Sequence, residues 1–192
     1  MAGTAGAAEL VSPDLRLPLP TGVALTLDAC GGETDWRILD TLVELQVPAT
    51  IFATALWLDG NAAALRVLRA HPALFQVENH GARHLPTVLG THPVYGLRPA
   101  GTLEAIRTEI GIASSLGFTV AGFSVNGDMG ASLPAARVAA RVGGAPDGAV
   151  IISHVNQPHR DSGAGVVAGI TALRRRGARF VRLDEAFPAP VG

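Results

Sequence analysis

The run Val23-Ala24-Leu25-Thr26-Leu27-Asp28 decides the fold of this chain. Apolar and β-branched residues end in a carboxylate, and Pro20 stands shortly before them. Such a run is typical of a short, fully buried strand. In parallel sheets polar groups gather just beyond the carboxyl ends of the strands. We therefore take residues 23–27 as the first strand of a parallel sheet and Asp28 as a candidate site residue.

Strand and helix patterns then alternate to the end of the chain. Further strands are expected at residues 49–54, 75–80, 119–125, 149–153 and 178–183. Helices are expected between them, beginning at Asp35 and lying around Leu65, Leu103, Pro134 and Val166. Alternation of this kind favours parallel strands joined by right-handed helical crossovers. The sequence predicts one α/β domain over residues 1–192, with its core in residues 23–183.

Composition and charge narrow the class of protein. Apolar residues make up 48% of the 192 residues and charged residues 16%, a balance that excludes disorder. The net charge of −1 gives no reason to expect nucleic acid or an anionic membrane as partner. The single cysteine, Cys30, excludes an internal disulfide and is expected to be a small buried residue. The oligomeric state is left open.

The apolar stretches of the sequence contain neither the pattern of a membrane span nor that of a signal peptide. No stretch approaches the roughly 18 residues of a membrane span, and residues 1–20 lack the pattern of a signal peptide. We expect a cytoplasmic protein if Met1 is the native start, and an extracytoplasmic one if an export signal was removed.

Polar side chains stand where several predicted strands end. Asp28 and His154 follow two of these strands directly, His80 ends a third, and Asp128 lies just beyond a fourth. Because parallel strands end at the same edge of a sheet, we expect Asp28 and His154 to face one cleft.

The segment Asn79-His80-Gly81-Ala82-Arg83-His84 holds two imidazoles four residues apart. They share one face if the chain turns helically, and neutral imidazole is a common ligand of zinc and related metals. The alternative is a chance pair of one surface and one loop histidine. The spacing predicts one divalent ion in the protein.

Three segments together resemble the polysaccharide deacetylase family, which includes nodulation-type chitooligosaccharide and peptidoglycan deacetylases. That family carries T-F-D-D-G after its first strand, H-[ST]-x-x-H after its third, and L-x-x-H near its end. Residues 26–30, 80–84 and 151–154 occupy those places in order, and the resemblance covers most of residues 23–183. It implies a distorted (β/α) barrel of about seven parallel strands.

The resemblance also implies the chemistry of the site. His80 and His84 would bind a divalent metal, most simply zinc, with Asp28 as general base and His154 as general acid. The implied reaction is hydrolysis of an N-acetyl group on a carbohydrate substrate.

Two departures from the family pattern stand out. The second aspartate, a metal ligand in the family, is replaced by Ala29, so Asp28 itself, Asp35 or Glu33 would have to complete the site. Asp35 is alternatively the N-cap of the next helix. The arginine-containing R-P-P-[YF]-G segment and its strand also have no counterpart. Because one helical pattern runs through Ile110 and Gly111 without a loop, we expect a break in the chain there rather than a true deletion.

Three further residues have two interpretations each. By the family resemblance, Asp128 is either a catalytic residue at the place of the aspartate that positions the base arginine, or it caps a turn. Trp57 either stacks on a sugar or packs in the core, as does Trp36. Asn156 is a candidate for lining the sugar pocket. Besides the deacetylase, the sequence leaves open a carbohydrate-binding relative without turnover and a metal hydrolase of another small amide.

Overall fold

Residues 14–82, 84, 86–93 and 98–188 are described by the structure, a computed structural model of the chain. The chain forms two compact units. Residues 1–14 and 85–122 make up one, and residues 15–84 and 123–192 make up the other. The second unit carries the sheet and is the one that positions the candidate site.

The sheet of the second unit has six strands in its described part. They are β1 (Val23–Ala29), β2 (Ala49–Ala53), β3 (Phe75–Asn79), β4 (Val125–Asn126), β5 (Val150–His154) and β6 (Phe180–Val181). Their order is β3-β2-β1-β5-β4, with β6 paired to the start of β1, and every pairing is parallel. The predicted parallel α/β sheet is confirmed.

Strand β1 lies at the centre of the sheet, and all of its residues are buried. A central parallel strand is covered on both faces, which is why its sequence is a continuous apolar run. Its neighbours β2 and β5 end level with it: Asp28 is the register partner of Phe52 on one side and of His154 on the other. The polar ends of these strands therefore meet at one edge of the sheet.

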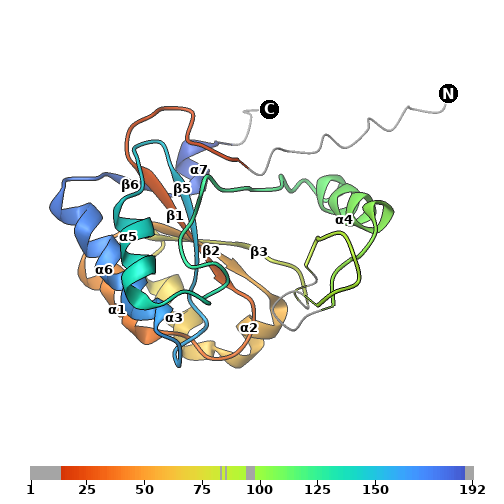
Figure 1. The fold of residues 1–192 in the computed structure, drawn as a ribbon, viewed down its shortest axis with the longest axis horizontal. Coiled ribbons are helices and arrows are strands. Elements are labelled where there is room, and N and C mark those ends of the chain that lie inside the picture. Colours follow the sequence, from red (N-terminus) through yellow and green to blue (C-terminus); the bar gives the residue numbers. More distant parts are fainter. Residues whose placement is uncertain (1–13, 83, 85, 94–97, 189–192) are drawn as a thin grey trace. The chain divides into compact units, whose positions relative to one another are not determined.

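The helices follow the strands in chain order: α1 (Trp36–Glu44), α2 (Ala55–Gly60), α3 (Ala62–Ala70), α4 (Leu103–Ser115), α5 (Ala135–Gly143), α6 (Ser162–Arg175) and α7 (Leu183–Ala186). Helices α1, α5 and α6 lie together on one side of the sheet (Figure 1). Helices α5 and α6 approach closely because Gly165 and Gly169 lack side chains: a Cβ on Gly169 would lie 2.5 Å from the Cβ of Val142.

One predicted strand is much shorter than expected, and one helix was not predicted. The strand expected at residues 119–125 is present only as Val125–Asn126, and residues 119–124 are exposed or half-buried. The helix expected around Leu65 is present as α3, and a further short helix, α2, which was not predicted, precedes it and meets it at Asn61. Strand propensity needs a neighbouring strand to be realised, and only the last part of the predicted segment pairs with β5.

The expected chain break near Ile110 and Gly111 was also wrong. Helix α4, in the first unit, runs through both residues without interruption, and Thr102 caps it by accepting a hydrogen bond from the backbone N–H of Ala105 at 3.1 Å. Between β3 and β4 the described residues contain this helix and an isolated bridge between Leu89 and Gly101, but no strand. The family strand that carries the arginine motif thus has no counterpart in the described residues.

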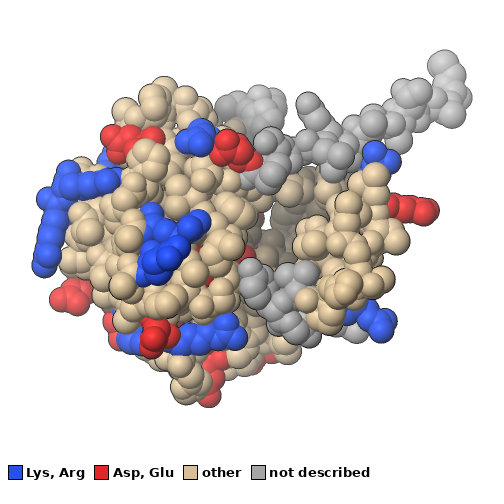
Figure 2. Space-filling view, in the orientation of Figure 1, with Lys and Arg blue, Asp and Glu red and all other residues tan. Residues whose placement is uncertain are grey.

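The surface agrees with the balanced charge of the sequence. On the face shown in Figure 2, the arginine and acidic side chains of the described residues lie among one another. In the described part of the chain, no helix is both long and apolar enough to cross a bilayer.

Candidate active site

Asp28 lies near the end of β1 and is almost fully buried. Its Oδ2 atom lies 3.5 Å from Nε2 of His80. Burial raises the pKa of Asp28 to about 6; the charge on His154 works against this rise, and the charge on Asp128 adds to it. A carboxylate with this pKa is ionised at neutral pH yet basic enough to accept a proton from water.

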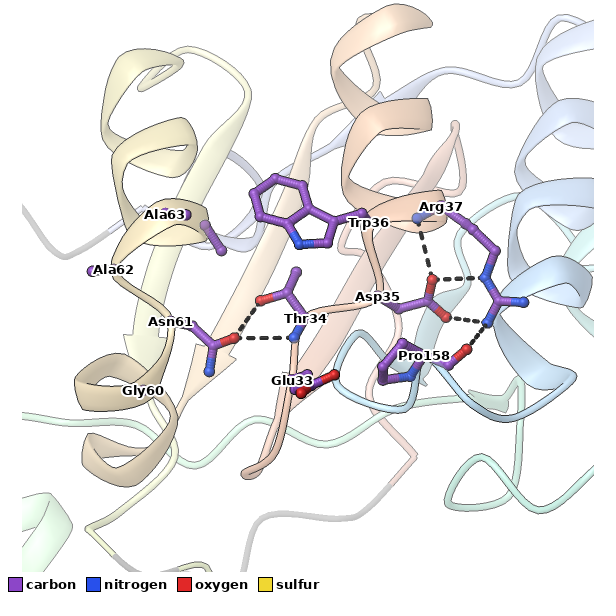
Figure 3. Close-up of a pocket in the computed structure, with 11 residues that line it drawn as sticks. Glu33, Thr34, Asp35, Trp36, Arg37, Gly60, Asn61, Ala62, Ala63 and Pro158 are labelled. Carbon is purple, nitrogen blue, oxygen red and sulfur yellow. Dashed lines mark hydrogen bonds and ion pairs between the residues drawn. The ribbon is translucent and has the colours of Figure 1, made fainter.

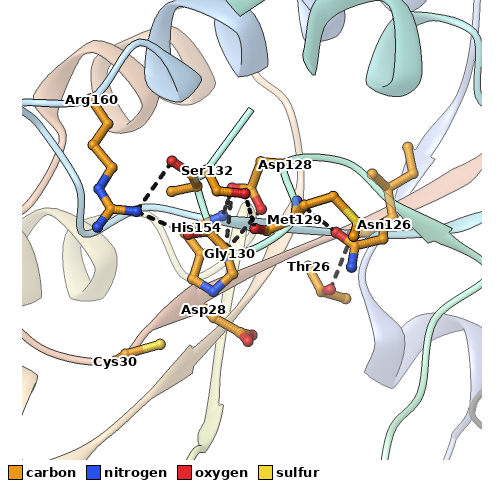
Figure 4. A network of polar contacts seen from close by, with 12 residues as sticks. Thr26, Asp28, Cys30, Asn126, Asp128, Met129, Gly130, Ser132, His154 and Arg160 are labelled. Carbon is orange, nitrogen blue, oxygen red and sulfur yellow. Dashed lines mark hydrogen bonds and ion pairs between the residues drawn. The ribbon is translucent and has the colours of Figure 1, made fainter. Parts of the chain in front are cut away.

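His154 ends β5 and is held by the buried carboxylate of Asp128 (Figure 4). Its backbone N–H donates to Oδ2 of Asp128 at 2.7 Å, and its Nδ1 lies 2.9 Å from Oδ1. Burial alone would lower the pKa of His154, but hydrogen bonds to Asp128 and Cys30, with the charges on Asp128 and Asp28, raise it to about 10. The imidazole is therefore protonated at neutral pH and can act as an acid.

The position of Asp128 depends on Gly127. A Cβ at that position would fall on the hydroxyl of Ser153 and 2.9 Å from the carbonyl oxygen of Ile152. The absence of a side chain lets the chain cross close to β5, where Asp128 meets His154. Asp128 therefore orients the histidine, a partner that the two predicted roles for this aspartate did not include.

His80 and His84 lie together beyond β3. Their ring centroids are 4.8 Å apart, and both Gly81 and His84 have a left-handed φ, so the pair forms by a bend of the chain rather than by a helical turn. Burial, with the charges on His84 and His154, lowers the pKa of His80 to about 4; burial and His154 also lower the pKa of His84. His80 is thus neutral, and its contact with Asp28 is not an ion pair.

Cys30 is the site residue that the sequence interpretation missed. Its Sγ atom lies 3.6 Å from Nε2 of His80. Among the described residues, two groups could hold a metal ion, one with Cys30, His80 and His84 and the other with Asp28, Cys30 and His154. Within each group the ligand atoms lie within 4.8 Å of one another. The sequence feature that could have identified Cys30 is its position two residues after Asp28, the predicted base.

Asp35 lies outside both groups and forms the N-cap of α1. Its carboxylate accepts hydrogen bonds from the guanidinium of Arg37 at 2.8 and 2.6 Å, and Gly163 leaves room for the pair. Glu33 is exposed, and its carboxylate lies 3.6 Å from Nε2 of His159. The structure therefore gives no support to Asp35 or Glu33 as the missing metal ligand, and it places Asp35 in the capping role.

The two predicted sugar-binding residues are both buried. Trp57 is 1% exposed and belongs to the hydrophobic core, so stacking on a sugar is excluded. Asn156 is 2% exposed, and its side-chain N–H donates to the carbonyl oxygen of Gly31. Asn156 thus ties together the two loops that follow β1 and β5 and does not line an open pocket.

Trp36 is the exposed tryptophan, at 41%, and lies in a groove between the start of α1 and the start of α3 (Figure 3). The groove is lined on one side by residues 33–37 and Pro158 and on the other by residues 60–64. The side-chain oxygen of Asn61 accepts hydrogen bonds from the backbone N–H and the hydroxyl of Thr34 at 3.0 and 2.7 Å, which joins the two sides of the groove.

Comparison with known proteins agrees with this geometry. The polysaccharide deacetylase family model matches residues 19–117, which is 99 of the 192 residues. A search of curated proteins gave no match.

Three solved structures illustrate the likeness in fold. A peptidoglycan N-acetylglucosamine deacetylase is 22% identical, with a TM-score of 0.64 over 91% of this chain and 92% of that one. The chitin deacetylase of the fungal pathogen Colletotrichum lindemuthianum is 20% identical, with a TM-score of 0.67 over 93% of both chains. A CE4 family pseudoenzyme from Bacillus anthracis is 20% identical, with a TM-score of 0.62 over 92% of this chain and 69% of that one.

The family match, the parallel α/β sheet and the strand-end cluster of Asp28, His80, His84 and His154 lead to one assignment. The chain belongs to the polysaccharide deacetylase family.

Proposed function

We propose that this protein is a zinc-dependent deacetylase that hydrolyses the N-acetyl group of an amino sugar in an oligosaccharide or polysaccharide. One observation carries the proposal. A carboxylate with a pKa of about 6 and an imidazole with a pKa of about 10 are register partners on adjacent strands, beside two further histidines. Titratable groups whose pKa values are pushed apart by their surroundings are suited to separate roles as base and acid.

The residues present fit a divalent metal. His80 and His84 are the two imidazoles that would hold it, and the low pKa of His80 keeps that ring in the neutral form that binds metals. When bound, such an ion polarises the acetamide carbonyl and acidifies a water molecule. Imidazole ligands are compatible with several transition metals, and zinc is the one that we propose.

Asp28 and His154 would divide the proton transfers of the reaction between them. The carboxylate of Asp28 takes a proton as water adds to the acetyl carbonyl carbon. The imidazolium of His154 gives a proton to the amine nitrogen as the C–N bond breaks, so acetate and a free amino sugar leave. Asp128 keeps His154 charged and oriented through its two hydrogen bonds. General acid–base steps of this kind each contribute about 10²- to 10⁴-fold to rate.

The groove of Trp36 supports a substrate with more than one sugar. One wall comes from residues 33–37, which follow the end of β1, and from Pro158 in the loop that follows His154, and the other comes from residues 60–64. An exposed indole beside backbone and amide groups is a suitable surface for the apolar face of a pyranose. We propose that a sugar next to the acetylated one stacks on Trp36.

A second function is a carbohydrate-binding relative without turnover. It is favoured by Ala29, which stands where the family has a metal-binding aspartate, and by the absent arginine motif. One structural neighbour is described as a pseudoenzyme, and a mutant of that protein as having restored enzymatic activity. Mutation thus separates the forms with and without enzymatic activity in a protein of the same fold.

Acetate release from N-acetylated chitooligosaccharides, with and without added zinc, tests the proposal. We expect release by the zinc-loaded protein, none after chelation, and loss of bound metal in the His80→Ala and His84→Ala double variant. The Asp28→Asn and His154→Gln variants should still bind metal but turn over at least about 100-fold more slowly. Binding of the oligosaccharide without acetate release would favour the second function.

A further inference from the structure

One ligand position of the proposed metal site has no carboxylate to fill it. Ala29 is fully buried and has no donor atom, and Asp35 is engaged by Arg37. If Asp28 serves as the base, only His80 and His84 remain from the family pattern. Catalytic zinc sites ordinarily have three protein ligands and an open position, so two imidazoles are one ligand short.

The thiol of Cys30 is placed to supply that ligand. Cys30 is the residue common to both candidate metal groups of the described chain, and its Sγ atom lies 3.6 Å from Nε2 of His80. The Nδ1 atom of His84 is buried and has no hydrogen-bond partner among the described residues. A buried polar atom without a partner is uncommon and is consistent with a ring kept free for a ligand.

The backbone around Cys30 is fixed from two sides. The hydroxyl of Thr54, at the end of β2, donates to the carbonyl oxygen of Cys30 at 2.7 Å. The side chain of Asn156 donates to the carbonyl oxygen of the next residue, Gly31. These bonds hold the cysteine at the strand end without using its sulfur. A pre-positioned ligand with a supporting hydrogen-bond shell is what metal sites require.

We infer that Cys30 is the third protein ligand of the metal and takes the place of the missing family aspartate. The inference rests on the metal site of the proposed function. The resulting Cys-His-His donor set leaves Asp28 free as base. Because thiolate is a softer donor than carboxylate, the site should prefer zinc, cobalt and cadmium over manganese and magnesium.

Cobalt substitution tests the inference by a readout other than activity. Because Cys30 is the only cysteine in the chain, any thiolate-to-cobalt charge-transfer absorption must come from it. We expect this near-ultraviolet band in the Co²⁺-loaded protein and its complete loss in Cys30→Ser. Zinc affinity of that variant should fall by more than the roughly 10- to 100-fold typical of losing an outer-shell partner.

The Cys30→Asp variant is the matched control, since it restores a carboxylate near the family position. It should bind metal without the sulfur band and with less preference for zinc over manganese. Circular dichroism of all variants checks that the fold is kept. Cobalt binding by the unaltered protein without the band, and with equal affinity in Cys30→Ser, would overturn the inference but leave the histidine site standing. If neither Co²⁺ nor Zn²⁺ binds to the unaltered protein, the proposed function fails as well.

Discussion

The carboxylate of Asp128 contacts His154 twice, at the backbone N–H and at Nδ1 of the ring. One buried side chain thus fixes both the position of the strand end and the orientation of its imidazole. With Nδ1 occupied by Asp128, the Nε2 atom is left to face the rest of the cluster. Acid–base pairs of this kind control which nitrogen exchanges its proton with the substrate.

The pH dependence of acetate release should be bell-shaped. Asp28 must be ionised to act as base, so kcat/KM should rise as pH increases through its pKa of about 6. His154 must be protonated to act as acid, so kcat/KM should fall as pH increases through its pKa of about 10. A pH–rate profile of the zinc-loaded protein measures both limbs. A profile that is flat from pH 5 to 8 would contradict the role of Asp28 as base, on the usual relation between pKa and rate.

The Asp128→Asn variant should lose stability mainly at neutral and acidic pH. The folded-state pKa of His154, about 10, is above its ordinary value, so the charged pair contributes stability that is fully present below about pH 6.5 and is lost as pH rises toward 10. Asparagine removes most of that contribution. Urea unfolding should show that the free energy of unfolding of the variant is about 1 to 3 kcal/mol below that of the unaltered protein at pH 6. This difference should be smaller at pH 10. An equal loss of unfolding free energy at pH 6 and at pH 10 would show that Asp128 and His154 do not form a charged pair.

The Gly127→Ala variant should be destabilised although only one methyl group is added. That methyl would collide with Ser153 and Ile152 on β5, so the strands must separate or the loop must move. We expect a loss of about 1 to 3 kcal/mol, as for other overpacked positions, together with slower acetate release because Asp128 is displaced. Gly60→Ala is the matched control, because a Cβ there would meet no atom within 4 Å. Equal stability of the two variants would contradict the close approach.

The Trp36→Ala variant should affect long substrates more than short ones. We expect kcat/KM on an acetylated chitooligosaccharide to fall about 3- to 10-fold, equivalent to roughly 1 kcal/mol of lost aromatic contact. Activity on a single N-acetylated sugar should stay unchanged, and Trp36→Phe should retain most of the activity on the longer substrate. Steady-state kinetics on both substrates measure the difference. An equal loss on both would show that Trp36 acts on the site as a whole and not on a neighbouring sugar.

Much of the fold could be predicted because buried parallel strands have distinctive sequences. The run that becomes β1 is apolar along its whole length, and Asp28 and His154 mark the ends of two such runs. The segment at residues 119–123 has the composition of a strand but pairs with no strand in the described residues. A sequence pattern shows what a segment prefers, whereas pairing depends on what the rest of the chain places beside it.

The site was predictable where a residue's role follows from its place at a strand end. Other roles depend on the direction of a side chain, which the pattern does not contain. Trp57 turns into the core, whereas Trp36 stays exposed, although both follow strand ends in the sequence. Cys30 was expected to be a small buried residue, yet it is only half-buried and lies beside His80, which directly follows β3. Contacts between distant segments were the missing information.

The register between β1 and β5 places Asp28 directly opposite His154, so the hydrogen-bond ladder of the sheet sets their separation. The loops that leave these strands, at residues 30–35 and 155–161, line the groove but do not determine that separation. Changes confined to the parts of these loops beyond Cys30, Gly31 and Asn156 should therefore alter which sugar is accepted without changing the separation of Asp28 and His154. In this fold the rigid sheet preserves the chemistry, and the loops are free to diverge in selectivity.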